Sequence, residues 1–241
     1  MVQKVKEHPI LFSTLMVQAI LEDRKTMTRR VIKPQPDGEQ VIIDPSAANH
    51  GIFDFKGVTH NTHFCPYGQV GDRLWVRETF VLEDDSEYGY SAEELAQFRK
   101  DRPVKTETEG EYTYHLIPHY KATEPEPYIV SAEQMERDSS DDRTRWKPAI
   151  FMPHWASRIT LEVTDIKVER LQEIEKHIED YKKEGYKPFI LQNSAIDGQD
   201  FEASADFAWF ENLWDFINAK RGYSWESNPW VWVIKFRKIG N

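Results

Sequence analysis

The feature that most constrains the fold is a set of short runs in which apolar and polar residues alternate. The clearest runs cover residues 73–80, 157–171 and 230–237. Alternation with a period of two places successive side chains on opposite faces of a β-strand. Because these runs do not alternate regularly with helical segments, a doubly wound parallel sheet is disfavoured. The pattern favours an α+β or β-barrel domain with few helices.

A helical pattern occurs in only a few places. Apolar residues recur at helical spacing, or the composition is helix-prone, in three segments: 15–23, 173–184 and 204–219. Ser13 or Thr14 can cap the first of these helices, and Gly185 can end the second. The strands near 29–33, 73–80, 157–170 and 229–238 are therefore expected to form one barrel, with the first helix packed against it.

The negative charge of the chain is concentrated in one region. Residues 83–142 hold 17 acidic and 6 basic side chains, a net charge of −11, whereas the whole chain has −10. Residues 1–34 hold seven Lys and Arg against three acidic residues. A local basic patch can still attract an anionic ligand, since salt screens charges beyond ~10 Å. We interpret 1–241 as a single domain with an acidic insertion at about 84–147 that adds little to its core.

The cellular compartment is predicted from the absence of membrane-spanning and secretion patterns in the sequence. No run approaches the ~20 apolar residues of a membrane span, and the N-terminus has no pattern of a cleaved signal. Cys65 is the single cysteine, so no internal disulfide forms. We expect a cytoplasmic protein that does not contact a membrane.

The segment RKTMTRR at residues 24–30 combines four cations with two threonine hydroxyls. Cations after a helix complement the negative end of its dipole, which is a structural explanation. The same side chains suit recognition of a phosphate or a base edge. On pattern alone the two explanations carry equal weight. The candidate ligand-binding residues here are Thr26, Arg29 and Arg30.

The stretch of sequence that contains this segment is similar to the opening of ASCH-domain proteins, above all a group common in phages and prophages. Four blocks resemble that group in the same order: ILFSTLMVQAILEDRKTMTRRVIKPQP, CPYGQVGDRLWVRETF, MPHWASRITLEVTDIKVERLQEI and LWDFINAKRGYSWESNPWVWVIKF. The resemblance covers both ends of the chain and misses most of 83–148. It implies a PUA-like mixed β-barrel with flanking helices, and a ligand that is RNA, single-stranded nucleic acid or a modified nucleoside.

The resemblance also implies a catalytic site. Hydrolytic members of the family use a Lys, a Thr three residues later and a distant Glu, which match Lys25, Thr28 and Glu184. Glu175 and Glu179 are alternatives for the carboxylate. A desolvated Lys can act as a base, and Thr28 can act as nucleophile or position a water. The implied site needs neither a metal nor another cofactor.

A second group of candidate ligand-binding residues lies on two of the predicted strands. Its members are Trp75, Arg77, Glu78, Trp155, Ser157 and Arg158. Charged residues in apolar strands are uncommon unless they are paired or line a pocket. An aromatic face beside an Arg suits stacking on a base. A strand with one solvated face explains the pattern as well, and the family resemblance favours a pocket wall.

Two other patterns are weaker. His60, His63 and Cys65 form H-x-x-H-x-C, which is a partial zinc pattern, but no second cluster completes a four-ligand site. We therefore predict no metal. The terminal aromatic stripe of Trp225, Trp230 and Trp232 is more typical of a core than of a ligand platform.

Three functions follow from these patterns. The leading hypothesis is binding of nucleic acid or a modified nucleotide by the segment from Lys25 to Arg30. The alternative is a hydrolase, either an N4-acylcytidine amidohydrolase or a ribonuclease. The third is a phage accessory protein that binds a protein partner through its acidic insertion. In the first two cases Lys25, Thr28, Arg29 and Trp75 are expected to line one pocket.

Overall fold

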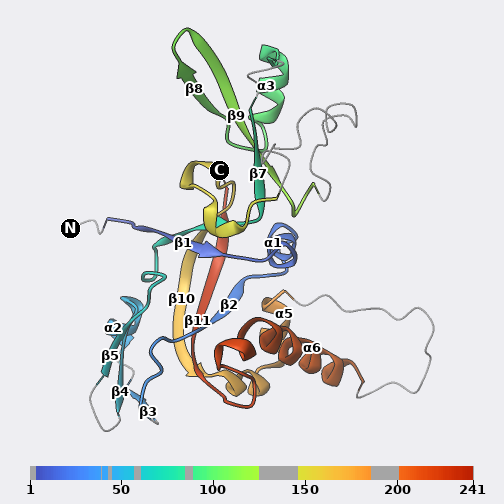
Figure 1. Cartoon of the computed structure of the whole chain (residues 1–241). Helices are drawn as coiled ribbons and strands as arrows, with labels where there is room; N and C mark the ends of the chain where they lie inside the picture. Colours follow the sequence, from blue (N-terminus) through green and yellow to red (C-terminus); the bar gives the residue numbers. More distant parts are fainter. Residues whose placement is uncertain are drawn as a thin grey trace. The chain divides into compact units, whose positions relative to one another are not determined.

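The computed structural model shows an α+β protein in which strands outnumber helices (Figure 1). It describes residues 4–38, 40–42, 45–56, 61–84, 89–124, 146–185 and 201–240. The strands are β1 (Glu7–Leu11), β2 (Met27–Val31), β3 (Gln40–Ile42), β4 (Ile52–Lys56), β5 (Asn61–Phe64), β6 (Arg73–Arg77), β7 (Phe80–Asp84), β8 (Lys105–Glu109), β9 (Tyr112–Tyr120), β10 (Thr160–Arg170) and β11 (Trp230–Ile239). The α-helices are α1 (Thr14–Leu21), α2 (Pro45–Asn49), α3 (Ala92–Phe98), α5 (Ile178–Lys183) and α6 (Phe201–Asn218).

The strands form three sheets. Their orders are β1-β6-β10-β11-β2, β3-β4-β5 and β7-β9-β8. The strands β2, β6, β10 and β11, which match the four expected strands, belong to one sheet, although Phe80 of the expected strand 73–80 lies in β7 of another sheet. Within the described residues none of the three sheets closes on itself, so the closed barrel that the sequence predicts is not observed. In this part of the chain no helix combines the length and hydrophobicity needed to cross a membrane.

The chain divides into two compact units. The first comprises Met1–His8, Ala19–Arg73 and Leu161–Lys238, and the second comprises Pro9–Gln18, Leu74–Thr160 and Ile239–Asn241. Each unit is described by itself below.

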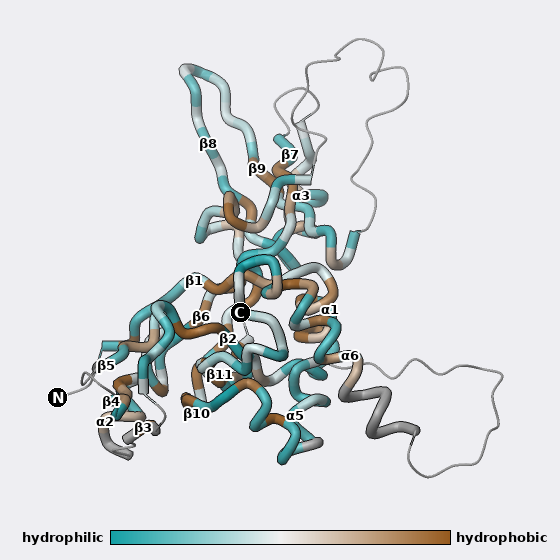
Figure 2. Tube along the Cα trace, turned by 60° about the horizontal axis from the view of Figure 1, so that its bottom comes forward, coloured by the Kyte–Doolittle hydropathy of each residue, from teal (hydrophilic) through white to brown (hydrophobic). Residues whose placement is uncertain are grey.

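The core of the first unit is formed by strands β2 and β11 with the helices α5 and α6. β2 and β11 are antiparallel, with Thr28 opposite Ile234 and Arg30 opposite Trp232. The buried cluster comprises Met27, Leu171, Ile174, Tyr181, Phe210, Trp214, Trp225, Val231 and Val233. Apolar residues along β11 give some of the brown stretches of Figure 2. Trp225, Trp230 and Trp232 are all buried, which confirms that the terminal aromatic stripe is core.

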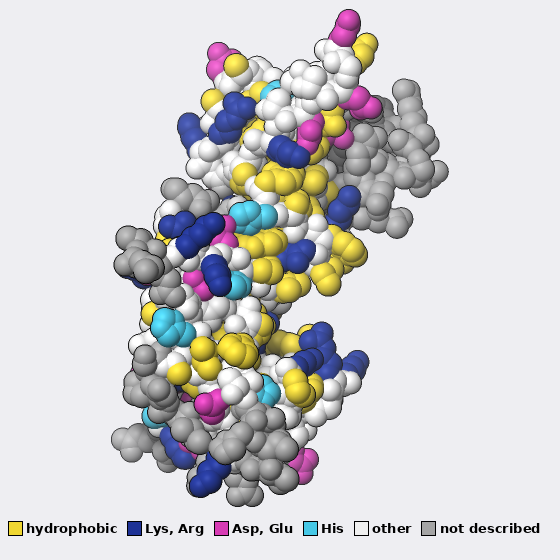
Figure 3. All heavy atoms as spheres, turned by 90° about the vertical axis from the view of Figure 1, so that its left-hand side faces the viewer, with side chains coloured by type: hydrophobic (Ala, Val, Ile, Leu, Met, Phe, Trp, Pro, Cys, Tyr) yellow, Lys and Arg dark blue, Asp and Glu magenta, His cyan; other side chains and the backbone are white. Residues whose placement is uncertain are grey.

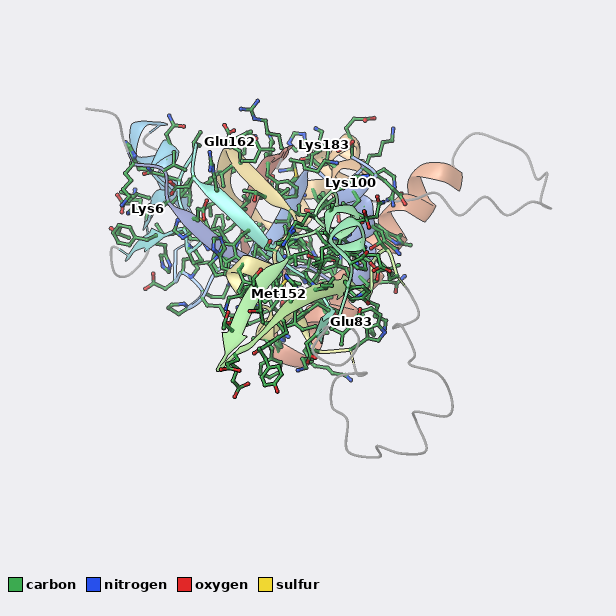
Figure 4. The ribbon with its side chains drawn as sticks, turned by 90° about the horizontal axis from the view of Figure 1, so that it is seen from above. Lys6, Glu83, Lys100, Met152, Glu162 and Lys183 are labelled. Atoms are coloured by element: carbon green, nitrogen blue, oxygen red, sulfur yellow. The ribbon has the colours of Figure 1, made fainter. Side chains whose placement is uncertain are left out.

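The second unit contains the sheet β7-β9-β8, in which β8 and β9 form a hairpin (Figure 1). Its core cluster joins Phe80, Tyr120, Met152 and Ala156. Met152 is labelled in Figure 4. Ile117 and Tyr120 of β9 are fully buried. The described part of 84–147 thus contributes some residues to a core, since β9 brings Tyr120 into this cluster.

Candidate functional site

The segment that follows α1 is attached by hydrogen bonds to the end of α5. The Thr26 amide donates to the Lys183 carbonyl oxygen at 2.9 Å, and the Arg24 guanidinium donates to the Gly185 oxygen at 2.6 Å. Lys25 and Glu184 form an isolated antiparallel bridge between these two contacts. Lys183, on α5, is labelled in Figure 4. The backbone itself therefore places Glu184 beside Lys25.

Gly185 makes this close approach possible. Its φ of +97° is in a region that L side chains rarely adopt. A Cβ at this position would lie 2.9 Å from Cβ of Ala19 and 3.2 Å from Cβ of Lys25. Glycine thus ends α5 and lets the chain pass directly against Lys25, as the sequence predicts for the helix end.

The Glu184 carboxylate lies between two buried cations. Its Oε2 atom accepts a hydrogen bond from Nζ of Lys25 at 2.8 Å, and its Oε1 atom accepts one from Nη1 of Arg29 at 3.0 Å. The Lys25 ammonium also donates to the Glu184 carbonyl oxygen at 2.9 Å. The Lys25, Glu184 and Arg29 side chains are 0%, 5% and 1% exposed. The predicted proximity of Glu184 and Lys25 is therefore observed.

Arg29 also contacts two further carboxylates. Its Nη2 atom lies 2.8 Å from Oε1 of Glu169, on β10, and 3.3 Å from Oδ2 of Asp180, on α5. Its Nε atom donates to the same Glu169 oxygen at 3.1 Å. Burial alone would lower the pKa of Arg29, but Glu184 and Glu169 more than offset it and the pKa is raised. Arg29 is thus a permanently charged residue that is neutralised within the protein.

The pKa of Lys25 shifts in the opposite direction to that of Arg29. Burial lowers the pKa of the Lys25 ammonium below its ordinary 10.5. Glu184 opposes this change, Arg30 and Arg29 add to it, and the net direction is downward. A lysine with a lowered pKa gives up its proton more readily than an exposed lysine does, and a carboxylate lies within hydrogen-bond distance of it.

The other face of β2 presents Thr28 and Arg30. Alternation along a strand places these two side chains opposite to Arg29. Thr28 is 3% exposed, and no hydrogen bond of its hydroxyl is observed within the described residues. Burial lowers the pKa of Arg30, while Tyr67 and Glu184 partly offset that effect. Thr26 is exposed, so its hydroxyl is not part of the buried cluster.

The contacts of Lys25 and Arg29 limit the kinds of ligand that the segment 24–30 can bind. A phosphate needs cations whose charge is not already neutralised. Lys25 and Arg29 already bind Glu184, and Arg29 binds Glu169 and Asp180 as well. Direct phosphate binding by these two cations is therefore disfavoured. The Lys25–Glu184 pair suits acid–base chemistry instead.

The structure also decides between the three candidate carboxylates. Glu175 and Glu179 are exposed, and Glu179 pairs with Lys182 on the surface of α5. Glu184 alone among them reaches Lys25. Sequence reasoning did not find Glu169 or Asp180. The i,i+3 spacing of Asp180 and Lys183 indicates the ion pair between these two residues. No sequence pattern indicates the contact of Glu169 with Arg29.

In the second unit, Glu78 and Arg158 form a buried pair. The Arg158 guanidinium donates to both Glu78 oxygens, at 2.9 and 3.1 Å, and to the Thr123 hydroxyl at 3.1 Å. It also lies 3.9 Å from the centre of the Tyr120 ring. Burial raises the pKa of Glu78, and Arg158 partly offsets this. Both charged groups are satisfied by the protein.

The remaining predicted residues of the second unit have different environments. The Ser157 hydroxyl donates to the Val76 carbonyl oxygen at 2.9 Å, which is a structural contact. Trp155 packs against the cluster around Tyr120. Trp75 lies partly exposed on β6, with the Arg77 guanidinium 5.3 Å from its ring centre. The predicted pocket shared by Trp75 and Lys25 remains a prediction, because the two belong to different units.

A cluster that the sequence did not reveal surrounds His119, on β9. Its Nε2 atom lies 2.6 Å from Oε2 of Glu83, and its Nδ1 atom contacts Glu124. Glu83, labelled in Figure 4, is on β7. Arg102 binds Glu124 at 2.8 Å. Burial opposes the charging of His119, but hydrogen bonds to Glu124 and Glu83 raise its pKa to about 9. His119 is thus an imidazolium held between two carboxylates.

The partial zinc pattern does not form a metal site in the described residues. No group of three His, Cys, Asp or Glu side chains there is arranged to hold an ion. His60 lies outside the described residues. Burial raises the pKa of the Cys65 thiol to about 12, so this thiol is protonated at neutral pH.

Comparison with known proteins gives no relative. No family model, curated protein or solved structure matches the chain.

Proposed function

We propose that this chain binds a modified nucleoside or nucleotide beside Lys25 and hydrolyses an N4-acyl amide on its cytosine base. The buried contact between Lys25 and Glu184, at 2.8 Å, carries the proposal. The resemblance to ASCH-domain proteins supports the substrate class and the pairing of Lys25 and Thr28 with a distant carboxylate. We also propose that the α+β fold is an open variant of the PUA-like barrel. This rests on the same four blocks of sequence.

The lowered pKa of Lys25 supports its role as a general base. A general base works best when its pKa lies near the working pH, and the pKa of Lys25 is lowered by burial. Glu184 fixes the position of the Lys25 amine, since it is itself held by Arg29 and by the backbone at Gly185. The Thr28 hydroxyl is the other polar group of the family's pattern, and it lies three residues along the same segment.

The proposed reaction is an ordinary amide hydrolysis. The Lys25 amine takes a proton from a water molecule while the water oxygen bonds to the acyl carbon. The bond from that carbon to N4 then breaks, and the proton on Lys25 passes to the departing N4 atom. The products are a carboxylic acid and cytidine. Because Lys25 is 2% exposed, an amide reaches it only when covering side chains move aside.

The test is turnover of N4-acetylcytidine, followed by the release of cytidine. Lys25→Met keeps most of the side-chain volume and removes the amine, so it should abolish turnover. Glu184→Gln should lower kcat, because a neutral amide holds the Lys25 amine and the Arg29 guanidinium in place less firmly than the carboxylate does. Lys182→Ala is the matched control, since Lys182 is an exposed lysine on the neighbouring helix. A Lys25→Met variant that is folded and as active as the wild type would overturn the assignment, as would a wild type with no turnover.

Binding of nucleic acid without turnover is the second candidate. The observation that favours it is the partly exposed Trp75 with Arg77 over its ring. This arrangement is independent of Lys25. The role of the acidic insertion in binding a protein partner remains a prediction, because residues 125–145 lie outside the described residues.

A further inference from the structure

The Arg29 guanidinium binds two carboxylates with different parts of its fork. Its Nη1 atom donates to Glu184 at 3.0 Å, whereas its Nε and Nη2 atoms both donate to one oxygen of Glu169, at 3.1 and 2.8 Å. A guanidinium is planar and rigid, so it fixes the directions of the carboxylates that it binds. Glu169, near the end of β10, is thus connected to Glu184 by a single buried side chain.

Burial strengthens the effect of Glu169 on Arg29. On the face drawn in Figure 3, Lys and Arg side chains lie at the surface, where water and salt screen their charges. The Arg29 side chain is 1% exposed and Glu169 is 17% exposed. Charges interact more strongly where the effective dielectric constant is low. Arg29 therefore responds to the loss of a carboxylate partner more than a surface arginine does.

Glu169 differs from Asp180, the third carboxylate that contacts Arg29. Asp180 lies 3.3 Å from Arg29 and also binds Lys183, labelled in Figure 4, at 3.1 Å. For Glu169, Arg29 is the cation observed within ion-pair distance in the described part of the chain. The charged and titratable groups around Lys25 and Arg29 come from β2, β10, β11 and the region of α5: Arg30, Glu169, Asp180, Tyr181, Lys183, Glu184 and Lys235.

We propose that Glu169 is a positioning residue, which acts through Arg29 to keep the Glu184 carboxylate shared between Arg29 and Lys25. Glu169 neutralises Arg29 at Nε and Nη2, so Glu184 needs to bind Arg29 with one oxygen only. Without Glu169, Arg29 draws the Glu184 carboxylate away from the Lys25 amine. The inference rests on the proposed function, in which Lys25 is the base, and adds a residue that reaches Lys25 only through Arg29 and Glu184.

Removal of Glu169 should change the protonation of Lys25. A nearby carboxylate favours the charged form of a lysine, and a nearby cation disfavours it. Glu169→Gln leaves Arg29 less neutralised, so the pKa of Lys25 should fall further below 10.5. Because the proposed reaction needs the neutral amine, the acidic limb of the pH profile of kcat should move to lower pH. The maximal kcat should fall about ten-fold, since Glu184 holds the amine less closely.

The test measures Lys25 directly and needs no substrate. The full chain is labelled with 13C-lysine, and the Cε signal of Lys25 is followed by NMR across the pH range in which the protein stays folded. Lys25→Met identifies this signal by its loss. The titration midpoint should be lower in Glu169→Gln than in the wild type. Glu162→Gln is the matched control, because it removes a carboxylate of the same strand that pairs with the exposed Arg237 (Glu162 is labelled in Figure 4). Its titration curve should match that of the wild type.

A shorter acid at the same position tests the charge and its distance separately. Glu169→Asp keeps the charge and withdraws the carboxylate by one methylene, so its midpoint and its kcat should lie between those of the wild type and Glu169→Gln. A role in stability alone would leave the pH profile of kcat unchanged. Thermal melting identifies the folded variants, and Glu169→Asp decides the question where Glu169→Gln does not fold.

The outcomes separate this inference from the proposed function. Identical Lys25 titration curves in the wild type and in the folded Glu169 variants would overturn the inference, whether or not N4-acetylcytidine is hydrolysed. Equal shifts in Glu169→Gln and Glu162→Gln would also overturn it, because the loss of any carboxylate on β10 would then be sufficient. A curve shifted by Glu169→Gln alone, in a protein without turnover, would support the positioning of Lys25 by Glu169 and overturn the proposed function.

Discussion

The Nζ atom of Lys25 lies 2.8 Å from Oε2 of Glu184, although 159 positions separate the two residues in the sequence. The opposite oxygen of the same carboxylate binds Arg29. Both cations therefore contact Glu184. Arg29 has Glu169 and Asp180 as further carboxylate partners, whereas Glu184 is the carboxylate that the structure places beside Lys25. This asymmetry makes Glu184 the residue on which the buried cluster depends most.

Replacement of Glu184 by Ala should destabilise the protein by about 3–5 kcal/mol, because it removes the carboxylate that both buried cations, Lys25 and Arg29, contact. The free energy of unfolding from urea titrations measures this loss. Glu179→Ala is the control, since Glu179 forms an exposed pair with Lys182 and should cost less than about 1 kcal/mol. Equal losses in the two variants would show that the buried pair contributes no more than a surface pair.

Gly185 offers a second test, with a control of the same backbone conformation. Gly185 and Gly222 have φ of +97° and +85°, so alanine is strained at both. At Gly185 a Cβ would also lie 2.9 Å from Cβ of Ala19, whereas nothing lies within 4 Å at Gly222. Gly185→Ala should therefore lower Tm more than Gly222→Ala does. Thermal melting of both variants decides this, and equal shifts would exclude a role for the close approach to Lys25.

The elements that could be predicted from the sequence are those with a regular pattern. Alternation identified β10 and β11, and the apolar spacing at Phe210 and Trp214 identified α6. The run 73–80 was expected as one strand, but β6 ends at Arg77 and Phe80 begins β7, which belongs to another sheet. Alternation reports which face a side chain occupies and does not report where the chain changes sheet.

For the candidate site, too, local sequence patterns indicate single segments but not the contacts between distant ones. The segment with Lys25 and Arg29 could be found because its charges are adjacent in sequence. Glu169 and His119 could not, because Arg29 is 140 positions away from Glu169 and Glu83 is 36 positions away from His119, on another strand. A buried charge is recognised only with its partner, and pairing across a sheet leaves no local signal. Family resemblance, rather than periodicity, indicated Glu184.

Stability should depend on pH through His119. Burial alone would lower the pKa of His119, but Glu124 and Glu83 more than offset it and raise the pKa from an ordinary 6.5 to about 9 in the folded protein. Arg102 also lies 3.3 Å from the Nδ1 atom of His119. A raised pKa means that the stabilisation is complete below about pH 6.5 and is lost as pH rises through about 9. Its size is on the order of 3 kcal/mol.

The measurement is the unfolding free energy of the wild type and of His119→Gln between pH 6 and pH 10, a range of about four units around the two pKa values. Other groups titrate in both proteins and cancel in the difference. The variant should be less stable at the acidic end, and the gap should shrink as pH rises. A gap that stays constant, or grows, would show that His119 is not charged in the folded state.

The contribution of residues 84–147 to the fold is tested at Tyr120. This side chain is fully buried among Phe80, Met152 and Ala156, and its hydroxyl donates to the Ala156 oxygen at 2.9 Å. Tyr120→Ala should cost about 3–5 kcal/mol, as expected for a large buried aromatic residue.

Two further variants divide that loss into its causes. Tyr120→Phe removes only the hydroxyl and should cost about 1 kcal/mol, the usual value of one hydrogen bond. Tyr112→Ala is the control on the same strand, because Tyr112 is 81% exposed and its loss should stay within about 0.5 kcal/mol. Urea unfolding followed by tryptophan fluorescence measures all three. If Tyr120→Ala were as stable as Tyr112→Ala, β9 would be dispensable and the acidic region would be an appendage after all.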